Sequence, residues 1–119
     1  MSDTAYEQLG RIVRTLDLAA PAAHVDVAFG LPVARATVTV TKLGTGAWSD
    51  GPVTIEALGA GAGSPVIAFS PAATIAAGGG RVVLDDLDGE RGLRIAAPVV
   101  ESQGTQPDVL AQVVVELFG

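Results

Sequence analysis

Apolar and polar residues alternate strictly from Ala34 to Thr41, where alanine and valine take one set of positions and arginine and threonine take the other. Successive side chains of a β-strand point to opposite faces, so this pattern predicts a strand with one buried face. The same alternation runs from Val25 to Phe29, with His24 and Asp26 facing outward, and from Val53 to Ala57. Such one-sided strands are typical of antiparallel sheets that cover a core with one face.

Five other segments are rich in β-branched and aliphatic residues and are bounded by turn residues, so each of them also predicts a strand. They are Arg11 to Leu18, Pro65 to Phe69, Arg81 to Leu87, Leu93 to Glu101 and Val109 to Phe118. The resulting eight short strands follow one another with no long helical pattern between them. We therefore expect an all-β protein in which two antiparallel sheets pack as a β-sandwich, of either jelly-roll or immunoglobulin-like topology.

The N-terminal segment carries a competing pattern. Ala5, Leu9 and Ile12 fall at helical spacing, although Gly10 weakens a helix there. We expect residues 1–10 to form a short arm or a helical turn ahead of the sandwich. No shift in composition marks a domain boundary, so the whole chain of 119 residues is expected to form a single domain.

Composition narrows the functional classes. The chain has 7 Lys and Arg against 13 Asp and Glu, a formal net charge of −6 that repels nucleic-acid phosphates and anionic membrane surfaces. We therefore expect neither nucleic acid nor membrane as a partner. The chain has no cysteine, which excludes disulfides and thiolate metal sites, and its first residues lack the basic and apolar regions of a secretory signal.

The sequence has no glycine-rich phosphate loop ahead of its lysine, and none of its serines lies in a nucleophile elbow. We expect no enzymatic activity and no cofactor. An acidic cluster, formed by Asp85, Asp86, Asp88 and Glu90, carries the oxygen ligands that calcium prefers. Its spacing departs from that of a calcium loop, so two interpretations stay open: a cation site, or a solvated hairpin turn with Asp88 and Gly89 at its tip.

Trp48 follows a glycine-containing turn, where an aromatic side chain has several common uses. It can cap one open end of a sandwich, anchor a contact with a partner, or stack on a sugar. The sequence alone does not distinguish these uses, so Trp48 is a candidate for a subunit interface and also for a glycan site.

The last strands are apolar on both faces. Val113 and Val115 share one face of the closing strand, while Val114 and Phe118 share the other, and the segment that ends at Val100 shows the same two-sided pattern. A sheet covers a core with only one face. We therefore expect the second face, including Val100, Val114 and Phe118, to be covered by a partner subunit or by the N-terminal arm.

From about Ala34 to the C-terminus, five features follow one another in a characteristic order. They are the alternating strand Ala34 to Thr41, a turn with Gly46 and Trp48, and the segments GPVTIEAL (51–58), GLRIA (92–96) and AQVVVELFG (111–119). This order resembles the β-sandwich modules of tailed-phage virions, which occur in head decoration and spike proteins and in fibre-like appendages.

The resemblance implies a non-enzymatic virion component that coats or projects from the capsid or the tail, commonly as a symmetric homo-oligomer. It implies that the partners are copies of the chain and capsid or tail subunits, and that the protein is made in the host cytoplasm and ends in the virion. The alternative is a carbohydrate-binding module, or a spike that binds a host-surface glycan, with Trp48 as the stacking residue.

Overall fold

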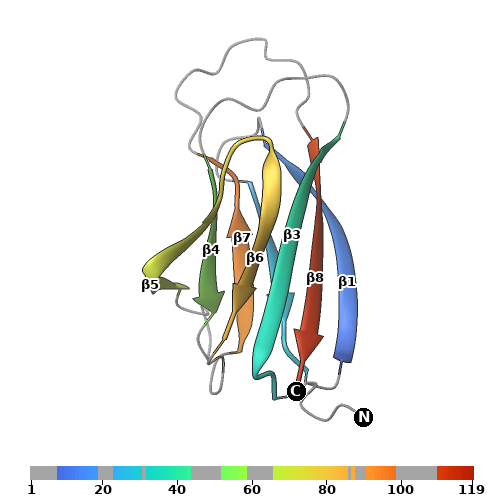
Figure 1. The fold of residues 1–119 in the computed structure, drawn as a ribbon, viewed down its shortest axis with the longest axis vertical. Helices are drawn as coiled ribbons and strands as arrows, with labels where there is room; N and C mark the ends of the chain where they lie inside the picture. The colour runs from blue at the N-terminus through green and yellow to red at the C-terminus, as the bar shows by residue number, and fades with distance from the viewer. Residues whose placement is uncertain are drawn as a thin grey trace.

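The computed structural model describes residues 8–18, 23–30, 32–43, 52–58, 66–85, 87, 91–98 and 110–119. These residues form eight β-strands (Figure 1), and they include no helix that is long and apolar enough to cross a bilayer. The strands are β1 (Gln8–Asp17), β2 (His24–Ala28), β3 (Arg35–Leu43), β4 (Val53–Leu58), β5 (Val66–Ile75), β6 (Gly79–Leu84), β7 (Gly92–Ala96) and β8 (Leu110–Phe118). Each of the eight predicted segments overlaps one of these strands.

The strands form two four-stranded antiparallel sheets, which we name sheet A (β1-β8-β3-β6) and sheet B (β2-β7-β4-β5). The first strand pairs with the last, the second with the seventh, the third with the sixth and the fourth with the fifth. This nested pairing is what one long hairpin produces when it is rolled up, which is a jelly roll. The expected β-sandwich is confirmed, and Figure 1 shows the strands of sheet A side by side across the front.

The core lies between the two sheets and is built from the inward positions of the alternating strands. On β3, Ala36, Val38 and Val40 are 0%, 0% and 1% exposed, as the alternation predicts. Fully buried side chains of the central strands come from both sheets. They include Val38, Val40, Val113 and Val115 of sheet A and Ile55, Leu93 and Ile95 of sheet B. Burying each of them contributes about 1.5–3 kcal/mol, so this apolar layer holds the sheets together.

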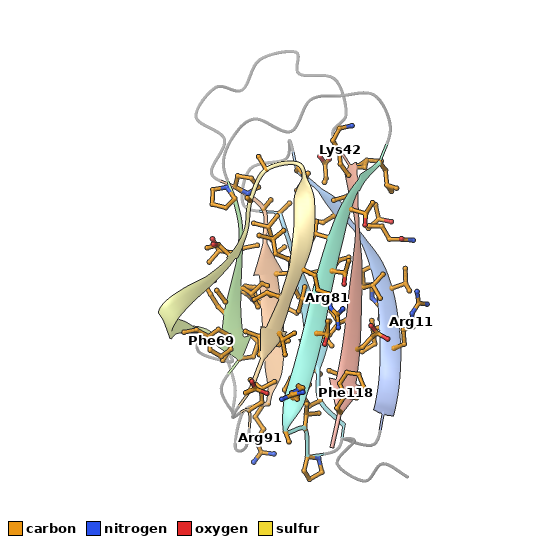
Figure 2. All side chains as sticks on the ribbon, viewed as in Figure 1. Arg11, Lys42, Phe69, Arg81, Arg91 and Phe118 are labelled. Carbon is orange, nitrogen blue, oxygen red and sulfur yellow. The ribbon has the colours of Figure 1, made fainter. Side chains whose placement is uncertain are left out.

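Strand β5 is longer than predicted because it bulges. The register of β4 and β5 jumps between Ile55 and Glu56, which leaves residues 69–72 of β5 with no opposite residue on β4. This stretch contains Pro71, which has no N–H to donate and therefore suits an unpaired position. Phe69, labelled in Figure 2, packs partly against the core. The predicted strand ended at Phe69, whereas the observed strand continues through the bulge.

Residues 8–13 lie in β1, so the helical alternative for the N-terminal segment is wrong there. β1 pairs with β8 over its whole length, with a register shift between Gln8 and Gly10. Hydrogen bonding to a full-length neighbouring strand outweighs a helical spacing that Gly10 already weakens. Residues 1–7 of the expected arm lie outside the described residues.

A tight turn joins β5 of sheet B to β6 of sheet A. The Gly79 N–H donates to the Ala76 carbonyl at 3.1 Å. Gly78 and Gly79 have φ angles of 101° and 109°, which L side chains rarely adopt. A Cβ on Gly79 would also lie 2.6 Å from the Val40 carbonyl oxygen, whereas a Cβ on Gly78 would meet nothing within 4 Å. Gly79 is therefore required both for its backbone angle and for its close approach to β3.

We expect the Gly79→Ala variant to lose about 3 kcal/mol of unfolding free energy and the Gly78→Ala variant about 1–2 kcal/mol, because both gain backbone strain but only the first meets the β3 backbone. Urea denaturation of the two variants beside the wild type measures the difference. Equal losses would mean that the approach of Gly79 to Val40 does not constrain the turn.

Candidate assembly surface

The outer face of sheet A consists of the residues that alternate with the core positions of its four strands. Directly opposite residues of an antiparallel pair share a face, so the strand registers identify its members. On the central strands they are Leu110, Gln112, Val114, Glu116 and Phe118 of β8 and Arg35, Thr37, Thr39, Thr41 and Leu43 of β3. On the edge strands they include Arg11, Val13 and Thr15 of β1 and Arg81 and Val83 of β6. Figure 2 labels Arg11, Arg81 and Phe118 of this set.

Large apolar side chains gather on this face. In the described segments, the exposed large hydrophobic residues are Val13, Leu43 and Val83, at 39%, 38% and 46%. All three lie on the outer face of sheet A. Val114 and Phe118 of β8 are half-buried on the same face, and Val114 lies directly opposite Val13. Single exposed apolar residues are ordinary, but their collection on one face is typical of an interaction surface.

Thr37 is buried, although the alternation predicted it on the solvent side. It is 2% exposed and lies on a central strand, directly opposite Val83 on β6 and Glu116 on β8. Within the described part of the chain, no buried side-chain nitrogen or oxygen lacks a hydrogen-bond partner, so its hydroxyl is satisfied. The middle of the outer face therefore already excludes water at Thr37.

Charges on this face occur with both signs. Arg11 on β1 lies directly opposite Glu116 on β8. Arg35 Nε donates to Asp85 Oδ1 at 2.6 Å and so ties β3 to the residue that follows β6. Opposite charges facing one another across strands contribute about 0.2–1 kcal/mol. The hydrogen bond to Asp85 therefore fixes the Arg35 side chain, and the charges on this face are mixed in sign.

The outer edge of β1, with which none of the described strands pairs, carries a charge at a core-facing position. Arg14 lies opposite Val113, whose side chain is in the core, yet the Arg14 side chain is exposed and its Nη1 donates to the Val13 carbonyl at 3.0 Å. An inward-pointing charge on an edge strand is a common device against edge-to-edge pairing. The face of sheet A is therefore better suited to a partner than this edge.

The outer face of sheet B carries a row of charged side chains, although apolar residues such as the buried Leu58 share this face. Asp26 on β2, Arg94 on β7 and Glu56 on β4 form one cross-strand row. Arg94 donates from Nε and Nη2 to the two carboxylate oxygens of Asp26 at 2.8 and 2.9 Å. These hydrogen bonds lower the pKa of Asp26 from its ordinary value, although partial burial opposes them, and they raise the pKa of Arg94. His24 faces outward as predicted, with its Nε2 3.7 Å from Asp26 Oδ2.

The predicted interface residues fall into two groups. The structure brings Val114 and Phe118 together on the outer face of sheet A, on the central strand β8. Trp48 and Val100 lie outside the described residues, so their interface roles and the glycan role of Trp48 stay predictions.

The acidic cluster is described at one position only. Asp86, Asp88 and Glu90 lie outside the described residues, while the carboxylate of Asp85 already accepts a hydrogen bond from Arg35. The part of the chain that the structure describes holds no group of three or more His, Cys, Asp or Glu side chains placed to bind a metal ion. A cation site at this cluster stays a prediction.

The hairpin alternative for the acidic segment is wrong. β6 pairs with β3 in sheet A, whereas β7 pairs with β2 and β4 in sheet B, so the segment between them crosses from one sheet to the other. Leu87 in this connection is 1% exposed, and its N–H donates to the Ala34 carbonyl at 3.2 Å. An Asp-Gly turn occurs in hairpins and in other connections alike, so the local signal could not separate the two.

Sequence reasoning missed three apolar members of the outer face, Val13, Leu43 and Val83. The sequence contained a signal for two of them. Ile12 precedes Val13, and Val82 precedes Val83, so each of these strands has apolar residues on both faces. The same signal identified Val114. Leu43 had none, since the predicted strand ended at Thr41.

No protein-family model matches the chain, and no curated protein matches it. Among solved structures, the chain is similar to one from Bacillus endospore appendages, which are described as a novel family of disulfide-linked pili. The two are 12% identical, the match covers 99% of this chain and 94% of that chain, and the TM-score is 0.46. A likeness this distant carries no argument about function. The class that the structure itself defines is an all-β jelly-roll sandwich with one apolar outer face.

Val113 and Val114 form a matched pair for testing the two faces of β8. Val113→Ala is expected to lower the free energy of unfolding by about 2 kcal/mol, because Val113 is 0% exposed and its truncation leaves a cavity. Val114→Ala is expected to cost about 0.5 kcal/mol or less in the dilute chain, through strand propensity alone. Chemical denaturation at low protein concentration compares them, and a reversed order would contradict the assigned faces.

The pair of Asp26 and Arg94 predicts a pH-dependent stability. Asp26→Asn is expected to cost under about 1 kcal/mol at neutral pH, since the pair is partly exposed. Because the folded-state pKa of Asp26 is lowered from 3.8, its contribution is present above that value and is lost as the pH falls through the folded-state pKa. Denaturation of wild type and variant across the acid range checks this, and a difference that does not shrink with acid would refute it.

Proposed function

We propose that this chain is a non-enzymatic structural protein of a bacteriophage virion or phage-like particle, which decorates or projects from the capsid or the tail through subunit contacts. The observation that carries the proposal is the contrast between the two outer faces. Sheet A exposes Val13, Leu43 and Val83, whereas sheet B presents the ion pair of Asp26 and Arg94. The resemblance to tailed-phage virion modules suggests the kind of particle, and the apolar face suggests how the chain attaches.

The layout of the outer face of sheet A supports a contact surface. Protein interfaces combine apolar contacts with polar ones. Val114 lies on the central strand β8, while the edge strands carry the exposed Val13 and Val83 beside Arg11 and Arg81 (Figure 2). Burial of the apolar side chains favours association, and the arginines can keep contact with water.

Strand pairing within the single chain already orders the backbone of this face. β8 is hydrogen-bonded to β1 on one side and to β3 on the other, and both registers continue along the strand. Association is more favourable when little conformational freedom is lost on binding. A paired sheet therefore suits a structural role in which many copies must adopt the same geometry.

The alternative function, binding of a host-surface glycan, depends on Trp48. This residue lies outside the described residues, and no observation on the described ones favours that function. The proposal therefore concerns assembly.

Val114→Asp tests the proposal, with Thr74→Asp as the matched control that adds the same charge to an exposed position on the outer face of sheet B. An uncompensated carboxylate in an apolar contact costs about 3 kcal/mol, so Val114→Asp is expected to weaken assembly about 100-fold or more while the chain stays folded. Phe118→Asp is expected to act in the same direction, and Thr74→Asp is expected to assemble like the wild type.

Light scattering measures the mass, cosedimentation with undecorated phage shells measures attachment, and circular dichroism checks the fold. Retention of the wild-type oligomer mass and shell binding by Val114→Asp would refute the proposed surface. A wild-type chain that stays monomeric and ignores the shells would refute the structural role itself.

A further inference from the structure

We infer that the partner of the outer face of sheet A is the same face of a second copy, related by a two-fold axis that crosses β8 at Val114 and sets the two β8 strands antiparallel. The inference rests on the proposed function and deepens it, because it names the partner and the geometry of the contact. Three features of the face lead to it: the pattern along β8, the neighbours of Val114 and the area.

The outward side chains of β8 follow the same pattern in both directions from Val114. The nearest outward positions on either side are polar, Gln112 and Glu116, and the next are apolar, Leu110 and Phe118. A two-fold contact joins two identical surfaces and must therefore be self-complementary. If residue i of one copy contacts residue j of the second copy, then residue j of the first copy also contacts residue i of the second. Here Val114 meets Val114, Phe118 meets Leu110, and the Gln112 amide can donate to the Glu116 carboxylate.

A second two-fold axis fits the pattern less well. Face-to-face sheets keep their strands within about 30° of each other, so the axis runs either across the strands or along them. An axis along the strands that lies between β8 and β3 exchanges these strands and places Phe118 over Arg35 and Val114 over Thr39. An axis along the strands that lies over β8 instead places Glu116 over the Glu116 of the second copy, and like charges directly opposite each other are destabilising. The axis across the strands instead brings apolar residues of β8 onto apolar residues.

The residues level with Val114 agree with the axis across the strands. Val13 on β1 and Thr39 on β3 lie directly opposite Val114 on its two sides. Each of them then meets its own counterpart, so Val13, which is 39% exposed in the single chain, gains an apolar neighbour. Arg81, opposite Thr39 on the edge strand β6, would face the Arg81 of the second copy. The side chain is exposed and lies at the margin, so both guanidinium groups can extend into water.

The area of the face matches what a dimer needs. The four strands lie about 4.8 Å apart and have ten, nine, nine and six residues that rise about 3.3 Å each, so they cover about 540 Å² in projection. A stable interface buries about 800 Å² of accessible surface per partner, and the accessible area of a face covered with side chains exceeds its projection. One sheet face is therefore enough for a dimer.

Cysteine cross-linking tests the geometry, because the chain has no cysteine of its own. Val114→Cys lies on the axis and is expected to give a species of twice the chain mass on a non-reducing gel, after mild oxidation or with a short bis-maleimide. Leu110→Cys and Phe118→Cys are the matched controls. In the inferred dimer, identical residues at either of these positions lie about 26 Å apart, so each variant alone stays unlinked while their mixture links.

Circular dichroism of each variant confirms that it is folded before cross-linking. Linkage of Val114→Cys alone, together with linkage of the Leu110→Cys and Phe118→Cys mixture, supports the inference. Linkage only in a mixture of Val114→Cys and Thr39→Cys, or linkage of Phe118→Cys alone, would indicate an axis along the strands and overturn the inference.

The results distinguish failure of the inferred dimer from failure of the proposed function. An unlinked Val114→Cys in a chain whose mass is still that of an assembly overturns this inference alone. A folded monomer that still binds phage shells also overturns this inference alone, whereas a folded monomer that ignores the shells overturns both. If the Val114→Cys variant of such a monomer resists maleimide labelling, the chain's own residues cover the face.

Discussion

Strand β8 is hydrogen-bonded along both of its edges, to β1 and to β3, and this double pairing gives its side chains only two directions. The inward set, from Ala111 to Leu117, is buried and helps to close the core. The outward set must meet either water or a partner. Each Å² of apolar surface left in water forgoes about 25 cal/mol, so Val114 and Phe118 make the second outcome the favourable one.

The asymmetry between the two outer faces comes from the side chains and not from the fold. Both sheets have four strands, and both turn one face to the core. On the outer face of sheet B, water solvates the bidentate pair of Asp26 and Arg94, and the apolar Leu58 is buried. On the outer face of sheet A, the exposed residues include Val13, Leu43 and Val83. Exposed large apolar side chains that gather on one face are typical of an interaction surface.

Local patterns in the sequence were sufficient to predict all eight strands and the faces of most of them, because alternation reports burial directly. They could not predict the strand order, the bulge of β5 at Pro71 or the burial of Thr37, since each depends on neighbours distant in sequence. The helical spacing around Gly10 was overridden in the same way by pairing with β8. Of the candidate site, Val114 and Phe118 were predictable because β8 is apolar on both faces, and Leu43 was not.

The most direct measurement of the central claim is hydroxyl-radical footprinting of the chain in its assembled and dilute forms, with both outer faces followed in one experiment. If the outer face of sheet A is the assembly surface, the reactivity of Val13, Val114 and Phe118 falls on assembly while that of His24 on sheet B stays unchanged. Equal reactivity of the sheet A residues in the two forms, or protection centred on His24, would contradict the account.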